Sequence, residues 1–229
     1  MLIFTNSLLD CFIGDASVLW KRDKHELFPC GCSLKDGCGE TCLNRITYYE
    51  CDSTNCLLTQ CANRQFAELE KRENFGVEVM KTKDRGYGLR AIRTFKPHQI
   101  IVEYAGEIIS QEECKRRMKA IHKAKVSKSP SLSFYLMSFN GMIIDATRGT
   151  IARFVNHSCE PNCKMSKWTV GGEPRMALFA GSEGIMFGEE LTYDYNLSPF
   201  SFRRMQGCKC GAESCRGVLG PKNYKIARA

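Results

Sequence analysis

The densest feature of the sequence is a run of cysteines between residues 30 and 61. Seven of the 14 cysteines lie there, among many Gly, Asn and Asp residues and without a periodic apolar pattern: Cys30, Cys32, Cys38, Cys42, Cys51, Cys56 and Cys61. A segment that cannot build its own apolar core can fold around a metal ion instead. Tetrahedral zinc takes four thiolates, so seven cysteines complete two sites only if one thiolate bridges both ions.

The composition favours zinc over the alternative of three disulfides and a free thiol. The chain has 229 residues, of which 43% are hydrophobic and 25% charged, which suits one domain with appendages. It lacks an apolar run of membrane-spanning length and the features of a secretory signal, so we expect a soluble, intracellular protein with no membrane partner. Disulfides rarely persist in a reducing compartment, whereas zinc–thiolate sites do.

A second feature is the stretch from Arg153 to Cys163, with the sequence RFVNHSCEPNC. An apolar run leads into Asn, His, Ser and Cys, and a Pro-Asn turn then directs the chain away. Polar groups are therefore presented where a buried segment ends, a common setting for a functional site. Taken alone, the stretch is equally consistent with a structural loop that contains a satisfied histidine and two buried thiols.

From Phe75 onward, short β-branched runs predict several small sheets with few helices. Strands are expected near residues 77–80, 88–92, 99–104 and 141–145, with a hairpin of 167–170 and 175–180 around Gly171-Gly172. A capping box predicts a helix that begins near Ser110. Residues 119–133 are expected to form a basic, solvated insertion, and the leftover thiols of Cys11, Cys114 and Cys163 are expected to be buried.

Three motifs in this order, RGYGL (85–89), RFVNHSCEPNC (153–163) and GEELTYDY (188–195), resemble the SET-domain protein lysine methyltransferases. The cysteine run resembles the AWS (associated with SET) module, and Cys208, Cys210 and Cys215 resemble the post-SET module. The resemblance implies an N-terminal segment (1–29), an AWS-like module (30–74), a SET domain (75–200) and a post-SET module with a tail (201–229). The implied fold is mainly β, with several small sheets and a knot-like C-terminal threading.

The resemblance also implies three structural zinc ions. One is held by Cys30, Cys32, Cys38 and Cys42, and the second by Cys38, Cys51, Cys56 and Cys61, with the Cys38 thiolate shared. The third is held by Cys208, Cys210 and Cys215, and Cys159 of the central stretch supplies the fourth thiolate. These closed sites would contribute folding free energy and no catalysis.

The cofactor implied by the resemblance is S-adenosylmethionine. Its implied contacts are Arg85, Gly86, Tyr87, Ser133, Phe134, Tyr135, Asn156, His157, Gln206 and Lys209. The implied catalytic residues are Tyr195, Tyr193 and Tyr135. The phenol of Tyr195 is too weak a base at pH 7, so its expected roles are to orient the reacting groups and to stabilise partial positive charge. Tyr193 and Tyr135 would form aromatic walls around the lysine stem. A tyrosine at position 193 crowds the amine and favours mono- and dimethylation.

Within this family the chain is most similar to the absent-small-homeotic type of enzyme that methylates lysine-36 of histone H3, through RGYGL, KWTVGG and ELTYDYN. That resemblance implies a nuclear, chromatin-bound protein whose partners are the histone H3 tail within nucleosomes and an activating subunit. It also implies that residues 196–207 can block the lysine channel. The net charge of +8 and pI near 8.8 suit nucleosomal DNA as a further partner, although ordinary solubility explains such an excess equally well.

Two other classes stay open at this point. A catalytically silent SET domain acting as a chromatin-binding module would bind the cofactor without transferring a methyl group. A zinc-dependent nucleic-acid binder would lose affinity steeply with salt and bind no cofactor; it leaves Tyr193, Tyr195 and the NHSC stretch without a role.

Overall fold

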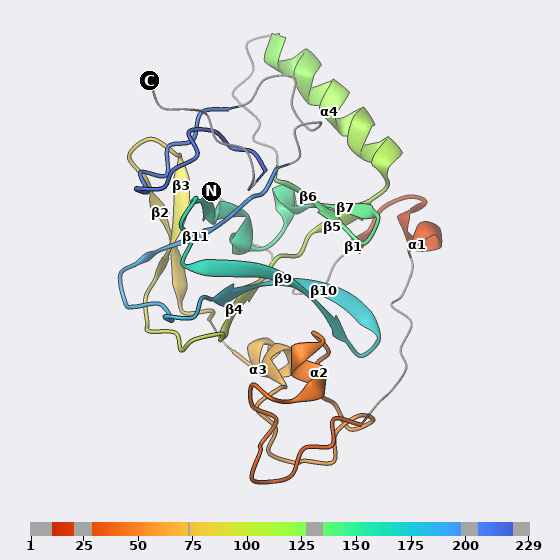
Figure 1. Ribbon diagram of the computed structural model, residues 1–229. Coiled ribbons are helices and arrows are strands. Elements are labelled where there is room, and N and C mark those ends of the chain that lie inside the picture. Colours follow the sequence, from red (N-terminus) through yellow and green to blue (C-terminus); the bar gives the residue numbers. More distant parts are fainter. Residues whose placement is uncertain (1–10, 21–28, 73, 127–134, 198–205, 222–229) are drawn as a thin grey trace. The chain divides into compact units, whose positions relative to one another are not determined.

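The computed structural model describes residues 11–20, 29–72, 74–126, 135–197 and 206–221. It is mainly β with few helices, as predicted (Figure 1). Two compact units share the chain: the first comprises 1–71, 103–153 and 167–177, and the second 72–102, 154–166 and 178–229. The predicted knot-like threading stays a prediction. None of the helices among the described residues has the length and apolar character needed to cross a membrane.

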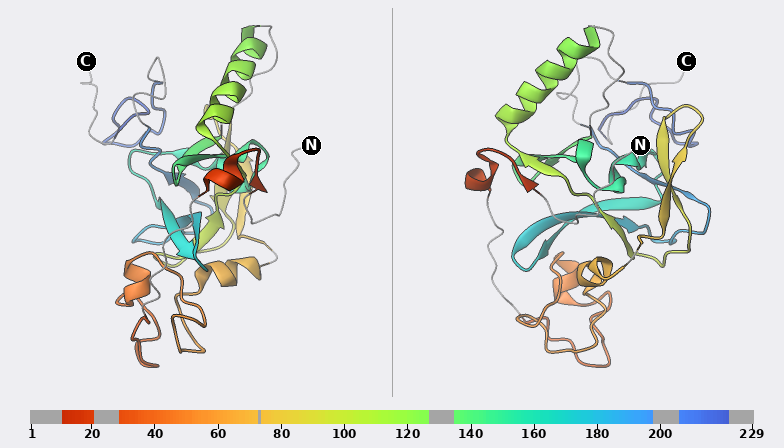
Figure 2. Two further views of the ribbon diagram at one scale, coloured as in Figure 1. Left: turned by 90° about the vertical axis from the view of Figure 1, so that its right-hand side faces the viewer. Right: turned by 180° about the vertical axis from the view of Figure 1, so that it is seen from behind.

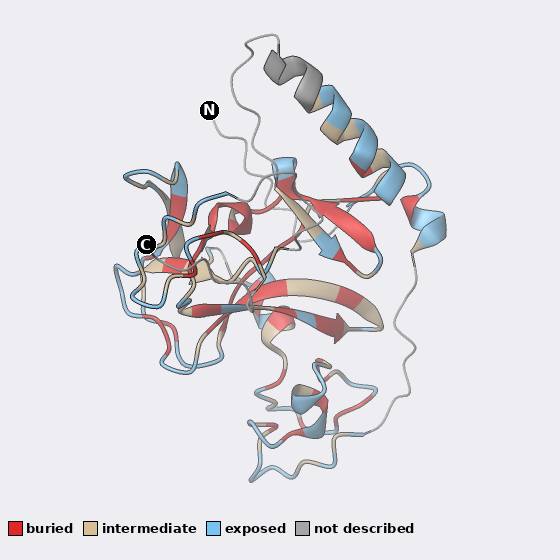
Figure 3. Ribbon diagram, turned by 45° about the horizontal axis from the view of Figure 1, so that its top comes forward, coloured by how far each residue is buried: buried red, intermediate tan, exposed pale blue. Residues whose placement is uncertain are grey.

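The first unit contains a four-stranded sheet in the order β1-β5-β7-β6. Its strands are β1 (Cys11–Phe12), β5 (Glu107–Ile109), β7 (Met142–Asp145) and β6 (Leu136–Phe139). β7 is buried along its whole length (Figure 3). β1 joins β5 in parallel, and the amides of Cys11 and Ile13 donate to the carbonyls of Gly106 and Ile108.

The segment of residues 11–20 is packed onto this unit. After β1 it forms the short helix α1 (Ala16–Leu19), whose Ala16 is fully buried. The indole of Trp20 donates to Glu173 at 3.1 Å, and its ring lies 5.7 Å from that of Phe139. Residues 11–20 therefore belong to the packed structure of the first unit.

Helix α4 (Gln111–Val126) begins where the capping box predicts. The Ser110 hydroxyl accepts a hydrogen bond from the Glu113 amide, so it caps the helix. The Arg117 guanidinium then ties the helix to the sheet through Glu107 and Asp145, at 2.5 and 2.7 Å. The helix continues to residue 126, well into the segment expected to be a solvated insertion, because its Lys, Arg and Ala residues have good helix propensity.

The cysteine-rich segment has little regular structure beyond α2 (Leu43–Ile46) and α3 (Gln65–Glu70) (Figure 2). Its core consists largely of sulfur atoms, with Cys38, Cys42, Cys51, Cys56 and Leu58 buried together. The carboxylate of Glu50 accepts the amides of Phe66 and Ala67 at the start of α3.

The second unit contains a sheet in the order β2-β3-β11-β8. β2 (Val77–Lys81) and β3 (Tyr87–Ala91) form an antiparallel hairpin, β11 (Glu190–Tyr193) pairs antiparallel with β3, and β8 (Asn156–His157) pairs parallel with β11. This sheet brings all three sequence motifs together, because RGYGL leads into β3, NHSC begins with β8 and GEELTYDY contains β11.

A third sheet has the order β4-β10-β9, with β4 (Ile100–Glu103), β10 (Glu173–Ala180) and β9 (Cys163–Val170). β9 and β10 form the predicted hairpin, and Gly171 and Gly172 both have positive φ at its turn. Two 3-10 helices, η1 (Ala146–Arg148) and η2 (Ile151–Phe154), lead to the central stretch.

Arg175 is the partner of a buried carboxylate in the first unit. Its guanidinium binds Glu103 through two hydrogen bonds, at 2.7 and 2.5 Å, and binds Glu70 of α3 at 2.7 Å. The Glu103 side chain is only 2% exposed. Because a buried carboxylate is tolerated only when it is paired, this ion pair ties α3 of the cysteine-rich segment to β4 and β10.

Replacing Arg175 with methionine should lower the free energy of unfolding by about 3–5 kcal/mol, because Glu103 would stay buried without its partner. Burial already raises the pKa of Glu103, and protonation removes the buried charge, so the loss should shrink as the pH is lowered. Urea unfolding at neutral and mildly acidic pH measures both effects.

Arg90→Met is the matched control, because the Arg90–Glu78 pair is about half exposed on both sides. An exposed ion pair contributes at most about 1 kcal/mol to the free energy of unfolding. Arg90→Met should therefore destabilise the chain much less than Arg175→Met. Equal destabilisation by both substitutions would contradict the assignment of Arg175 as the partner that the buried Glu103 carboxylate requires.

Candidate active site and metal centres

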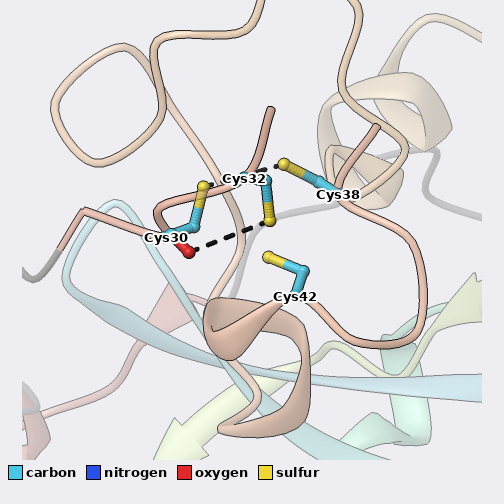
Figure 4. Close-up of side chains that lie close together, drawn as sticks. All are labelled: Cys30, Cys32, Cys38 and Cys42. Atoms are coloured by element: carbon cyan, nitrogen blue, oxygen red, sulfur yellow. Dashed lines mark hydrogen bonds between the residues drawn. The ribbon is translucent and has the colours of Figure 1, made fainter. Parts of the chain in front are cut away.

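The first cysteine cluster contains Cys30, Cys32, Cys38 and Cys42, whose sulfur atoms all lie within 4.8 Å of one another. Figure 4 shows the four side chains pointing toward a common centre. This is the set that the resemblance implies for one zinc ion. Burial opposes ionisation of Cys30, but the Cys32 amide and neighbouring thiols lower its pKa to about 7, so a thiolate suitable for a metal is available near neutral pH.

The second cluster differs in one member from the set implied by the resemblance. The sulfur atoms that lie within 4.8 Å of one another belong to Cys30, Cys38, Cys51 and Cys56. Cys61 packs against the same group, where burial and the nearby Cys51 and Cys56 thiols raise its pKa to about 11. Cys38, the thiolate that the resemblance implies is shared, belongs to both clusters, and so does Cys30.

The sulfur–sulfur distances fit zinc and not disulfides. All fourteen cysteines are free thiols, and Cys30–Cys38 and Cys38–Cys56 are separated by 3.7 and 3.6 Å. A disulfide requires roughly 2.05 Å, whereas four thiolates placed about 2.3 Å from a tetrahedral zinc ion are roughly 3.8 Å apart. The Cys51 sulfur also accepts the side-chain amides of Asn44 and Asn63, as a metal-bound thiolate does.

The third cluster lies in the second unit and contains Cys159, Cys208, Cys210 and Cys215. Cys159 comes from the central stretch and is 3.9 Å from Cys208, again near the separation expected of zinc ligands. Although burial opposes it, backbone amides including that of Cys159 lower the pKa of Cys210 to about 6. Residues 208–215 are thereby brought to the NHSC segment, as the resemblance implies.

His157 connects this cluster to the tyrosines. Its Nδ1 accepts the backbone amide of Tyr195 at 3.1 Å, and its Nε2 lies 3.4 Å from the sulfur of Cys159. Burial lowers the pKa of His157, so the ring is neutral and its proton resides on Nε2, where it can donate to the sulfur. One imidazole therefore contacts both a metal-ligand candidate and the backbone of Tyr195.

Tyr195 is fixed through both its backbone and its hydroxyl. The hydroxyl donates to the carbonyl of Val155 at 2.8 Å, and the Tyr193 ring lies 4.8 Å away from the Tyr195 ring. A phenol has a single proton to donate, so this bond leaves the Tyr195 oxygen able only to accept. An oriented acceptor suits a reaction in which positive charge develops nearby.

Asp194 and Arg216 brace the same region. The guanidinium of Arg216 makes two hydrogen bonds to Asp194, at 2.7 and 2.8 Å, and its backbone amide donates to the Cys159 sulfur. Burial opposes ionisation of Asp194, but the Arg216 hydrogen bonds outweigh it and lower the pKa of the carboxyl. Neither residue was predicted from the sequence, although Asp194 stands inside GEELTYDY and Arg216 directly follows the last cysteine.

The turn between β2 and β3 presents the RGYGL residues. Gly86 has a φ of 76°, and a Cβ at this position would meet no atom within 4 Å, so the backbone is open to a ligand there. Tyr87 is 49% exposed, and the Nε of Arg85 is buried without a hydrogen-bond partner among the described residues. Open backbone, an accessible aromatic face and an unsatisfied donor fit a polar, ring-containing cofactor.

Behind this turn, Glu190 joins three of the motif residues. Its carboxylate binds Arg85 at 2.8 Å and accepts the side-chain amide of Asn156 at 2.9 Å. The same Asn156 nitrogen donates to the carbonyl of Tyr87 at 3.1 Å. Gly88 leaves room for this network, because a Cβ there would lie 2.9 Å from Glu190 and 3.0 Å from Asn156 and would displace these side chains.

The remaining predicted contacts are placed as follows. Lys209 donates to the carbonyl of Asp84, which brings the cysteine loop to the β2–β3 turn, and Gln206 is exposed at the start of the same loop. Tyr135 belongs to the first unit, where its carbonyl accepts the Tyr104 hydroxyl at 3.2 Å. Ser133 and Phe134 lie outside the described residues, as do most of residues 196–207.

The three cysteines outside the clusters, Cys11, Cys114 and Cys163, differ in their exposure. Cys114 and Cys163 are buried, as predicted, and burial raises the pKa of Cys163 to about 12, so it is unreactive. The prediction for Cys11 was wrong, because β1 forms the edge of its sheet and the Cys11 side chain is exposed.

Comparison with known proteins identifies two domains. A family model described as SET domain matches residues 86–196, and one described as AWS domain matches residues 29–68. The first range contains RGYGL from Gly86 onward together with the NHSC and GEELTYDY motifs, and the second contains the first two cysteine clusters.

Several curated proteins are similar to this chain. Histone-lysine N-methyltransferase ash1 of Drosophila melanogaster is 40% identical over 204 residues, covering 88% of this chain and 9% of that protein. Histone-lysine N-methyltransferase SETD2 of Homo sapiens is 39% identical over 194 residues, covering 84% and 7%. Histone-lysine N-methyltransferase, H3 lysine-36 specific, of Kluyveromyces lactis is 40% identical over 217 residues, covering 89% and 30%.

The chain thus spans 30% or less of the length of each of these three relatives. Both domain models match in the order that the sequence motifs indicate, and the relatives include ash1 and an enzyme specific for lysine-36 of histone H3. The resemblance found in the sequence is therefore confirmed, and the chain belongs to the family of SET-domain histone-lysine N-methyltransferases that carry an AWS domain.

Proposed function

We propose that this chain transfers methyl groups from S-adenosylmethionine to the side-chain nitrogen of lysine-36 of histone H3 in nucleosomes, stopping at the mono- or dimethyl state. The observation that carries the chemistry is the Tyr195 hydroxyl, whose proton is donated to Val155 so that its oxygen can only accept. The relatives named for lysine-36 of histone H3 support the choice of substrate.

The cofactor, when bound, supplies an electrophilic methyl group on a sulfonium ion. The chain must then align an amine opposite that methyl group and exclude water. Tyr195 meets the electrostatic requirement, because an oriented oxygen acceptor stabilises the partial positive charge that develops along the transfer axis. The Tyr193 ring, 4.8 Å from that of Tyr195, supplies an apolar wall and a second hydroxyl close to the amine.

The target lysine must lose a proton before it can act as a nucleophile. Its reference pKa is about 10.4, and burial beside a cationic cofactor lowers that value. A separate strong base is therefore unnecessary, which agrees with the neutral, fully engaged His157. Tyr135 as a further wall of the lysine channel stays a prediction.

Three finer points belong to the same proposal. The chain acts in the nucleus, its basic surface contacts nucleosomal DNA, and an activating subunit relieves inhibition by residues 196–207. The excess of positive charge supports the DNA contact. Equal activity on a free H3 peptide and on nucleosomes would count against the inhibitory loop.

Replacing Tyr195 with phenylalanine should reduce the rate constant for methyl transfer about 10²–10³-fold while cofactor binding is retained, because only the charge-stabilising oxygen is removed. Labelled S-adenosylmethionine, recombinant nucleosomes and mass spectrometry locate the product. Label on another lysine would refute the substrate assignment. Absence of label from a zinc-loaded, cofactor-binding chain would favour the silent chromatin-binding module.

Tyr193→Phe is the matched substitution, two residues before Tyr195. It removes the hydroxyl that crowds the amine, so the enzyme should stay active and its products should shift toward trimethyl-lysine. The distribution of mono-, di- and trimethyl products at equal total turnover measures the effect. An unchanged distribution would show that Tyr193 does not limit the product state.

The purified chain should contain three zinc ions, and chelation should abolish both cofactor binding and cooperative unfolding, because metal binding contributes directly to folding. Cys159→Ser should remove one ion and weaken cofactor binding, since Cys159 contacts His157. Metal analysis and calorimetry measure these effects.

Comparing Cys61→Ser with Cys163→Ser tests the composition of the second cluster. Zinc loss on Cys61→Ser supports the set Cys38, Cys51, Cys56 and Cys61. Retention of all three ions would instead support Cys30 as the shared fourth ligand, as the mutual distances indicate. The buried Cys163 lies outside all three clusters, so its substitution should leave the zinc content unchanged.

A further inference from the structure

Glu190 has no role in the reaction as proposed so far, yet it contacts two of the residues expected to bind the cofactor. Its two carboxylate oxygens are divided between them, with Oε2 on Arg85 at 2.8 Å and Oε1 on Asn156 at 2.9 Å. Its side chain is 22% exposed, and that of Arg85 is 24% exposed. A partly desolvated, charge-assisted pair of this kind is stronger than one on an open surface.

The backbone around Glu190 fixes the position of its carboxylate. β11 pairs with β3 so that Glu190 faces Arg90 and Leu191 faces Leu89, and the carbonyl of Glu190 accepts the side-chain amide of Asn162. Gly88 leaves the space that the carboxylate occupies, since any Cβ there would lie within 2.9 Å of it. The backbone of Glu190 is therefore fixed within the sheet, and its carboxylate occupies the space beside Gly88.

The hydrogen bond from Asn156 determines which way its amide faces. Its nitrogen donates to Glu190 and to the Tyr87 carbonyl, which uses both N–H groups. Its oxygen makes no hydrogen bond to any residue that the structure describes, so the side chain presents an acceptor. A carboxylate at position 190 enforces this orientation, because it cannot donate to the amide oxygen.

We propose that Glu190 is a positioning residue for the cofactor: it orients the Asn156 amide so that its oxygen accepts from the cofactor's ammonium group, and it holds Arg85 beside the Gly86–Tyr87 turn. This inference rests on the proposed use of S-adenosylmethionine. The amino-acid end of that cofactor carries an ammonium group, which needs an acceptor. An Asn156 amide turned the other way would present donors to the ammonium and repel it.

Binding of S-adenosylmethionine and of S-adenosylhomocysteine, measured by calorimetry on the zinc-loaded chain, tests the inference without relying on turnover. In Glu190→Gln, Arg85 loses its charged partner and the residue at 190 can donate as well as accept, so only the Tyr87 carbonyl still enforces the orientation of the Asn156 amide. The dissociation constant should rise at least about tenfold, the effect of losing a hydrogen bond to a charged group. At saturating cofactor, the rate constant for methyl transfer should change little.

Glu189→Gln is the control, because Glu189 is the neighbouring glutamate and its carboxylate accepts the Met186 amide at an exposed turn. It should bind both ligands as the unmodified chain does. Equal weakening by the two substitutions would overturn the inference, since it would point to a general effect on the strand or on charge.

A reciprocal pair of substitutions separates positioning from folding. Asn156→Asp places two carboxylates against each other and should abolish binding of both ligands. Adding Glu190→Gln supplies a donor to the new carboxylate, which keeps an acceptor for the ammonium, so part of the affinity should return. No recovery in the double variant, with thermal unfolding unchanged, would overturn the inference.

The binding measurements distinguish the proposed function from the proposed role of Glu190. If the unmodified, folded and zinc-loaded chain binds neither ligand, the proposed function and this inference are both overturned. If it binds them and Glu190→Gln binds them equally well, only the role of Glu190 is overturned and the proposed function stands.

Discussion

The arrangement of the candidate active site depends on one neutral imidazole. His157 accepts the Tyr195 amide at one nitrogen and faces the Cys159 sulfur with the other, so the tyrosine proposed to be catalytic and a candidate zinc ligand are positioned by the same ring. Arg216 reinforces this arrangement, since its side chain holds Asp194 while its amide donates to Cys159. A site whose chemistry is mainly alignment needs such rigidity, because little acid–base catalysis compensates for a misplaced group.

The sheet of the second unit and the cysteine-rich segment of the first unit are stabilised by different interactions. The sheet of the second unit brings three short motifs together through ordinary strand pairing, with Leu89 and Leu191 fully buried on it. The cysteine-rich segment has a core of thiols and a single leucine, which provides little hydrophobic free energy. It is attached to the rest of the first unit by polar contacts, including Glu70 with Arg175 and the amide of Glu50 with the Thr169 carbonyl, and by the rings of Tyr48 and Phe66, which pack against Trp168.

Much of this could be predicted from the sequence, because the information is local. Alternating β-branched runs predict β2, β3 and β7, and the Ser110 hydroxyl predicts the start of α4. The contacts of Asp194, Arg216 and Glu190 could not be predicted, since they join side chains that are 22 to 105 positions apart in the sequence. The choice between Cys30 and Cys61 is likewise invisible in spacing, because both positions lie within reach of Cys38. The exposure of Cys11 depends on its edge position, which only the sheet order reveals.

That edge position has a consequence for how the chain avoids self-association. The two residues of β1 cover the outer side of β5, and Trp20 secures the segment that follows them. The AWS match begins only at residue 29, so a fragment cut at that domain boundary would lose β1 and leave β5 unpaired on the side that faces away from β7. An uncovered strand can pair with a strand of another molecule and seed aggregation. Residues 11–20 therefore protect the sheet against intermolecular pairing, a role that matching by domain family alone does not reveal.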